Sequence, residues 1–185
     1  RLDLNRGRTH DLPGETFQML GDDVAYMKLS SITIADVPRY MERAAGARVL
    51  VVDIRNYPNQ FVVYPLGGRL VERPTPFAVF TGAQGANPGA FRWSQGATLT
   101  PMAPRFEGRV VVLVDESSIS QSEFTAMALR AGPNTIVAGS TTAAADGNIS
   151  TVPLPGGLET WITGIGVFYP DRTPTQRIGI IPDLE

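Results

Sequence analysis

The chain has 185 residues, which fits one domain, and its 43% apolar and 18% charged residues are typical of a globular protein. The net charge of -2 and the scattered arginines give no sign of a nucleic-acid-binding surface. The absence of cysteine excludes disulfides, thiolate zinc sites and cysteine catalysis. No apolar run approaches the roughly 20 residues of a membrane span.

The predicted elements alternate between strands and helices. After a polar lead-in at residues 1–16, residues 24–31 alternate apolar and polar side chains, as a half-buried strand does. Residues 36–45 have helical spacing. Further predicted elements are a buried strand at 49–54, a helix or loop at 64–73, a strand at 77–81, an exposed loop or hairpin at 84–104, a buried strand at 110–115, a helix at 122–131, a strand at 135–138 and a strand that ends 158–169. This order predicts an α/β domain with a largely parallel sheet.

A serine cluster lies where a buried strand turns into a helix, in the segment VVVLVDESSISQSEF at residues 110–124. Helix-opening amides converge at such a turn, so Ser120 is a candidate nucleophile. The alternative is an ordinary helix start, with Ser122 as the best-placed cap and Glu123 adding a favourable charge. Ligands bind at the carboxyl ends of parallel strands, so we expect this turn to lie beside the turn at residues 55–60.

A nucleophilic serine needs a base, and this chain offers few. His10 is the only histidine and Lys28 the only lysine. His10 lies in the polar lead-in, where a plain surface role is the alternative. The strand pattern around Lys28 predicts a side chain that faces solvent. Asp146 begins an Asp-Gly turn signal and is a candidate catalytic carboxylate.

Five segments, in this order, resemble the C-terminal processing (tail-specific) serine proteases: VAYMKLSSI, VLVVDIRNYPNQ, VVVLVDESSISQSEFTAMAL, TIVAGSTTAAADGNIS and RIGIIPDLE. The resemblance covers residues 17–185. It implies a ClpP/crotonase-like α/β core with a mostly parallel sheet flanked by helices. It also implies polypeptide substrates cut near their C-terminus, no cofactor and no metal. A bacterial periplasmic or cell-envelope location is implied too, as are oligomers and a preceding PDZ-like module that would end within residues 1–16.

The resemblance assigns roles to individual residues. The nucleophile of the family is the first serine of S-x-S-E, which is Ser120 here. The Gln121 amide would donate to the oxyanion, and a second donor comes from a Gly-Gly turn that falls on Asn59 and Gln60. The lysine of the family's T-F-G-K-G loop falls on Ala145, within TAAAD. A Ser–Lys dyad of the usual form is therefore absent.

Other readings stay open. A branch resembling the tricorn core proteases uses serine with histidine and a carboxylate. His10 would be its base if the lead-in folds back over the site, with Asp146 as a candidate base or carboxylate. Otherwise the base lies in a preceding segment. A second hypothesis is a non-catalytic relative that binds peptides or apolar ligands, with aromatic residues near the mouth: Tyr57, Phe61, Phe91 and Trp93. A crotonase-type acyl-CoA enzyme is a third.

Overall fold

The computed structural model describes residues 10–185, so residues 1–9 of the predicted lead-in lie outside the described part. A five-stranded sheet has the order β1-β2-β3-β7-β8. Its strands are β1 (Phe17–Met19), β2 (Val24–Lys28), β3 (Val49–Asp53), β7 (Arg109–Val114) and β8 (Thr135–Gly139). β1 is antiparallel to β2, whereas the other three pairs are parallel. The predicted α/β class with a mostly parallel sheet is confirmed.

Within residues 10–185, three α-helices and two short 3-10 helices connect the strands. They are η1 (Leu29–Ser31), η2 (Ile34–Asp36), α1 (Val37–Ala44), α2 (Val63–Gly67) and α3 (Gln121–Arg130). The helix predicted at residues 36–45 buries one face, formed by Val37, Tyr40, Met41 and Ala44. Tyr40 stacks on Phe17 of β1 with ring centroids 5.2 Å apart. α3 packs against α2, β7 and β8. Within residues 10–185 no helix has the length and apolar character needed to cross a membrane.

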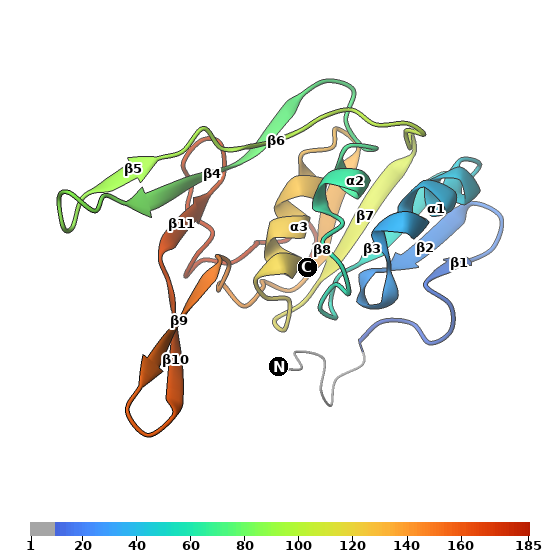
Figure 1. Cartoon of the computed structure of the whole chain (residues 1–185). Helices are drawn as coiled ribbons and strands as arrows, with labels where there is room; N and C mark the ends of the chain where they lie inside the picture. Colours follow the sequence, from blue (N-terminus) through green and yellow to red (C-terminus); the bar gives the residue numbers. More distant parts are fainter. Residues whose placement is uncertain (1–9) are drawn as a thin grey trace.

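A second sheet and a hairpin lie beside this body (Figure 1). β11 (Ile165–Phe168), β4 (Thr75–Ala83) and β5 (Phe91–Trp93) pair in that order, and β6 (Ala97–Leu99) also pairs with β4. β9 (Ile149–Leu154) and β10 (Leu158–Thr163) form a two-stranded hairpin whose residues are almost all exposed. The segment 84–104, predicted as an exposed loop or hairpin, contains the loop after β4 and the strands β5 and β6, both of which pair with β4 and not with each other. The β9–β10 hairpin was not predicted, because exposure on both faces leaves no apolar alternation in the sequence.

The loops after β3 and β7 lie side by side, as predicted. The Ser118 hydroxyl donates to the Ile54 carbonyl over 3.2 Å, and the Ser117 hydroxyl donates to the Arg55 carbonyl over 3.1 Å. Farther along, the Gln121 side-chain amide donates to the Gln60 carbonyl over 2.9 Å. These contacts hold the two loops together at the carboxyl edge of the sheet.

The described part of the lead-in covers the end of β2. The Leu12 amide donates to the Tyr26 hydroxyl, and the Thr16 carbonyl accepts from the Lys28 amide. The Lys28 ammonium donates to the Leu12 carbonyl over 2.9 Å, and this side chain is buried. The prediction that Lys28 faces solvent is therefore wrong, since strand alternation does not reveal a segment that packs over the strand.

Candidate active site

Ser120 is the N-cap of α3 and adopts a backbone conformation that L-residues rarely take, with φ 54° and ψ -115°. Such a conformation costs about 1–3 kcal/mol and is found most often at functional sites. The helix begins at Gln121, so Ser120 and not Ser122 is the cap, contrary to the prediction. The Ser122 hydroxyl is buried and makes no hydrogen bond to any described residue. The turn therefore sets Ser120 apart from the other serines.

Glu123 holds this conformation from inside the protein. Its side chain has no exposed surface, and its carboxylate accepts from the Ser120 amide over 3.0 Å. The same carboxylate accepts from the Thr142 hydroxyl over 2.6 Å, and from the amides of Ala144 and Ala145 over 2.9 and 3.0 Å. Four donors satisfy the buried charge. Glu123 thus ties the Ser120 turn to the loop at residues 140–148. From the sequence, Glu123 was expected only to add a favourable charge at the helix start, although the S-x-S-E spacing also carries the capping-box signal.

The loop at residues 140–148 leaves β8 at Gly139, which has φ 129°. A Cβ there would lie 1.9 Å from the Val114 carbonyl oxygen, so only glycine fits. Farther along, Ala144 has φ 60°, and its carbonyl accepts from the Arg177 amide over 2.8 Å. The Gln176 side chain donates to the Asp146 carbonyl over 2.8 Å. This loop is therefore held from both sides and brings Asp146 to a fixed place.

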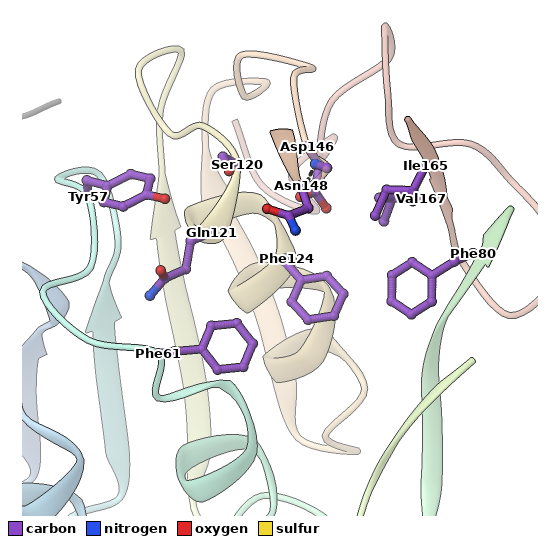
Figure 2. A pocket seen from close by; sticks show the side chains of 11 residues that line it. Tyr57, Phe61, Phe80, Ser120, Gln121, Phe124, Asp146, Asn148, Ile165 and Val167 are labelled. Carbon is purple, nitrogen blue, oxygen red and sulfur yellow. Dashed lines mark hydrogen bonds between the residues drawn. The ribbon is translucent and has the colours of Figure 1, made fainter. Parts of the chain in front are cut away.

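Ser120 lies in a pocket of about 350 Å³ that is mostly apolar. Figure 2 shows Ser120 and Asp146 at one end and the phenylalanine rings at the other. The lining residues are Tyr57, Phe61, Phe80, Ser120, Gln121, Phe124, Asp146, Gly147, Asn148, Ile165 and Val167. Tyr57 and Phe61 were expected near the mouth, whereas Phe80, Phe124, Ile165 and Val167 join it only through the packing of β4, α3 and β11.

Phe91 and Trp93 are not among the lining residues, so their predicted place near the mouth is wrong. Both belong to β5, in the second sheet. Trp93 packs edge-on against Phe168 with centroids 4.8 Å apart, and the Arg172 guanidinium lies 4.8 Å from its ring centroid. These aromatic residues stabilise the second sheet.

The amides expected to bind an oxyanion differ in what they contact. The Asn59 amide donates to the Leu29 carbonyl over 2.8 Å, and its side chain donates to the Ile32 carbonyl over 3.0 Å. The Asn59 amide is therefore engaged by the fold. The amides of Gln60 and Gln121 donate no hydrogen bond to any residue of the described part. Gln121 lines the Ser120 pocket, whereas Gln60 is not among its lining residues, so of the predicted donors the Gln121 amide is the better placed for a developing negative charge.

His10 lies at the same edge of the sheet, as the hypothesis of a folded-back lead-in required. Its Nδ1 pairs with Asp115 Oδ2, and its amide donates to Asn56 Oδ1 over 3.3 Å. Burial opposes ionisation of Asp115, but hydrogen bonds from Ser117 and His10 outweigh burial and lower the pKa of Asp115. His10 is not among the residues that line the Ser120 pocket. The structure thus places His10 against Asp115 and Asn56, outside the pocket lining, and Asp146 in that lining.

Asp146 is a buried carboxyl group with few partners. Its residue is 5% exposed. The Gly147 amide donates to Oδ1 over 2.7 Å, while Oδ2 is buried and has no partner among the described residues. Burial raises the pKa of Asp146 to about 7, and the nearby negative charge of Glu123 contributes. Asp146 therefore changes charge near neutral pH inside the Ser120 pocket.

This pKa makes a testable prediction about stability. The folded state retains a proton on Asp146 that the unfolded chain releases near pH 4, so ionisation above pH 4 destabilises the fold until pH 7. We expect the stability of Asp146→Asn relative to the wild type to increase from pH 4 to pH 8 by on the order of 4 kcal/mol, since one pKa unit corresponds to about 1.4 kcal/mol. Urea unfolding at both pH values measures it, with exposed Asp22→Asn as control. An equal difference at both pH values would contradict it.

The described geometry can be compared with known proteins. The family model "Peptidase family S41" matches residues 23–185. A putative peptidase from Parabacteroides merdae superposes with a TM-score of 0.79 at 19% identity, over 91% of this chain and 56% of that chain. Mature CPAF complexed with lactacystin gives 0.72 at 13%, over 88% and 47%. The photosystem II D1 C-terminal processing protease gives 0.59 at 22%, over 92% and 45%.

The chain spans about half the length of these solved structures, and at identities below 25% the TM-scores show a shared fold alone. No curated protein sequence matches the chain significantly. The family model covers nearly all of the residues, including the strand, serine turn and loop that form the pocket. The resemblance drawn from the sequence is confirmed: the chain belongs to peptidase family S41, the C-terminal processing proteases.

Proposed function

We propose that this chain is the catalytic core of a serine peptidase that hydrolyses peptide bonds near the C-terminus of protein substrates. Family membership supports the reaction class, and polypeptides are the substrates that a peptidase family implies. The C-terminal preference is supported by the likeness to a C-terminal processing protease. The ClpP/crotonase-like form of the core, a preceding PDZ-like module and oligomer formation are part of the same proposal.

The observation that carries the proposal is the conformation of Ser120. A surface helix start gains nothing from a φ of 54°, which costs free energy at a residue other than glycine. Glu123 maintains this conformation because its carboxylate accepts a hydrogen bond from the Ser120 amide. The outcome is a serine that lines the pocket instead of continuing the helix. Such a turn is what a nucleophile at a strand–helix junction requires.

The proposed reaction forms and breaks one acyl bond. Ser120 Oγ attacks the peptide carbonyl carbon while a base accepts its proton. The oxyanion accepts from the amides of Gln121 and Gln60, which donate to no other described residue. The C–N bond then breaks and the amine leaves with a proton. Water hydrolyses the resulting ester on Ser120 and releases the acyl product. The apolar part of the pocket would hold a substrate side chain.

Cleavage of an unstructured polypeptide tests this function. The full-length protein is incubated with a polypeptide whose C-terminal residues are apolar, and mass spectrometry identifies the products. We expect fragments shortened from the C-terminus. An intact polypeptide after prolonged incubation would contradict the proposal.

The alternative function is binding without hydrolysis, which the phenylalanines of the pocket favour: Phe61, Phe80 and Phe124. Phe61 and Phe80 each stack or tilt against Phe124, at 6.2 and 5.9 Å between centroids. Because no tryptophan lines this pocket, calorimetry is a better readout than tryptophan fluorescence. Saturable binding of a peptide or fatty acid with no cleavage would support the alternative.

A further inference from the structure

Asp146 is unusual because its carboxyl group is buried without a cation. Oδ2 has no partner among the described residues, and Gly147 supplies the one hydrogen bond to Oδ1. No ion pair of the described part includes Asp146. An unpaired buried polar atom of this kind costs stability, so its presence calls for a role other than folding. In Figure 2 the side chain lies at the Ser120 end of the pocket.

The groups around Asp146 set its pKa near neutral pH. Glu123 faces it from α3 and is acidic, so it disfavours a second negative charge. Tyr169, which follows β11, interacts with it electrostatically. Burial raises the pKa of Tyr169, the charge and hydrogen bond of Arg130 lower it, and the negative charges of Asp183 and Asp146 raise it, with a net upward shift. No described lysine or arginine is among the causes that shift the pKa of Asp146, which is about 7. A general base works best when its pKa lies near the operating pH.

The other candidates for a base are less well placed. Ala145 stands at the lysine position of the family pattern, and Lys28 lies at β2 with its ammonium bonded to the Leu12 carbonyl. His10 pairs with Asp115 and does not line the pocket. Asp146 and Ser120 do line the same pocket. Glu123, which bonds to the Ser120 amide and to the loop before Asp146, fixes the two relative to each other.

Resting on the proposed peptidase function, we propose that Asp146 is the general base that activates Ser120. Oδ2 is not hydrogen-bonded to Ser120 in the structure; when it comes within hydrogen-bond distance of Oγ, it accepts the proton of the Ser120 hydroxyl as Oγ bonds to the carbonyl carbon. The same proton passes to the nitrogen of the leaving amine as the C–N bond breaks. In the second half, Asp146 accepts a proton from the attacking water, and Ser120 Oγ takes it back as the ester bond breaks. Every proton is accounted for with no cofactor.

The rate of fluorophosphonate labelling tests this base, because the serine must lose its proton to react. We would measure it from pH 5 to pH 9 in the full-length protein and in Asp146→Asn, His10→Gln and Ser120→Ala. We expect the wild-type rate to rise with a midpoint near pH 7. Asp146→Asn should react about 100-fold more slowly or worse, with that pH dependence lost. His10→Gln should keep both the rate, within a few fold, and the midpoint.

The outcomes separate the two proposals. Labelling of Asp146→Asn at the wild-type rate, with Ser120→Ala unlabelled, would overturn the base while Ser120 stands as the nucleophile. Loss of the pH dependence in His10→Gln would also overturn Asp146 as the base and would assign the base to His10. This outcome does not depend on whether Asp146→Asn folds. A wild-type protein that is labelled no faster than Ser120→Ala would overturn the peptidase proposal and the base together. Greater stability of Asp146→Asn above pH 7, with slower labelling, would exclude a merely structural role.

Discussion

Replacing Ser120 with alanine is expected to lower kcat for peptide hydrolysis by about 10⁴-fold or more, as loss of a nucleophile does in serine peptidases. The remaining amides and pocket can still bind substrate, so KM should change much less. Initial rates on a peptide with an apolar C-terminus measure both constants. The reason is chemical, because the acyl-enzyme of the proposed reaction forms on the Ser120 hydroxyl.

Ser122→Ala is the matched control for this substitution. It removes a hydroxyl two residues away on the same helix start, and that hydroxyl is buried and has no partner in the described part. Deleting an unsatisfied buried polar atom leaves stability unchanged or raises it. We expect kcat within about twofold of the wild type. A Ser120→Ala protein that hydrolyses peptide as fast as Ser122→Ala would exclude Ser120 as the nucleophile.

Replacing Glu123 with alanine is expected to have the largest effect on stability, about 3–5 kcal/mol. The substitution leaves four donors without their acceptor: the Ser120, Ala144 and Ala145 amides and the Thr142 hydroxyl. It also opens a cavity at the start of α3. Urea unfolding followed by circular dichroism measures the loss. Glu116→Gln is the control, because Glu116 is exposed and bonds only to the Ser140 hydroxyl in the described part, so a change within about 0.5 kcal/mol is expected.

Glu123→Gln separates charge from shape at the same position. It keeps one acceptor but turns two N–H groups toward donors, so we expect about 2–3 kcal/mol of destabilisation. It also removes the negative charge that helps to raise the pKa of Asp146, so that pKa should fall. The midpoint of any surviving pH dependence should therefore move to lower pH. A midpoint that moves upward, or a variant as stable as the wild type, would contradict this role for Glu123.

The order of elements was predictable because the apolar runs are long and are clearly separated by turn-forming residues. The strands that became β3 and β7 are continuous apolar runs that end in acidic residues, and the serine cluster follows the second. Their loops meet because parallel strands end at one edge of a sheet. The adjacency of the serine turn and the residues 55–60 turn therefore followed from the sequence. The family resemblance followed from the order of five short motifs.

The pocket walls could not be predicted from periodicity. Phe80, Phe124 and Val167 come from β4, α3 and β11, and only packing brings them together. Lys28 looked exposed because alternation cannot show that residues 11–16 pack over β2. From the sequence, Glu123 was expected only to add a favourable charge to the helix start. In the structure, the loop at residues 140–148 donates hydrogen bonds to its carboxylate. Tertiary hydrogen bonds, which have no fixed spacing, account for each of these differences.

The family resemblance places Ala145 where the lysine of a Ser–Lys dyad would lie. The next residue, Asp146, has the buried oxygen that lacks a partner among the described residues. A serine peptidase with this loop needs its base from a neighbouring position, from His10 or from another segment. The strained conformation of Ser120 is present in each case. The identity of the nucleophile is therefore independent of the identity of the base.

The site of a covalent adduct tests the central claim most directly. The full-length protein is treated with a fluorophosphonate, digested and mapped by mass spectrometry. We expect one phosphonylated residue, Ser120, with an adduct absent from Ser120→Ala and present in Ser122→Ala. An adduct on any other residue, or equal labelling of the Ser120→Ala protein, would contradict it.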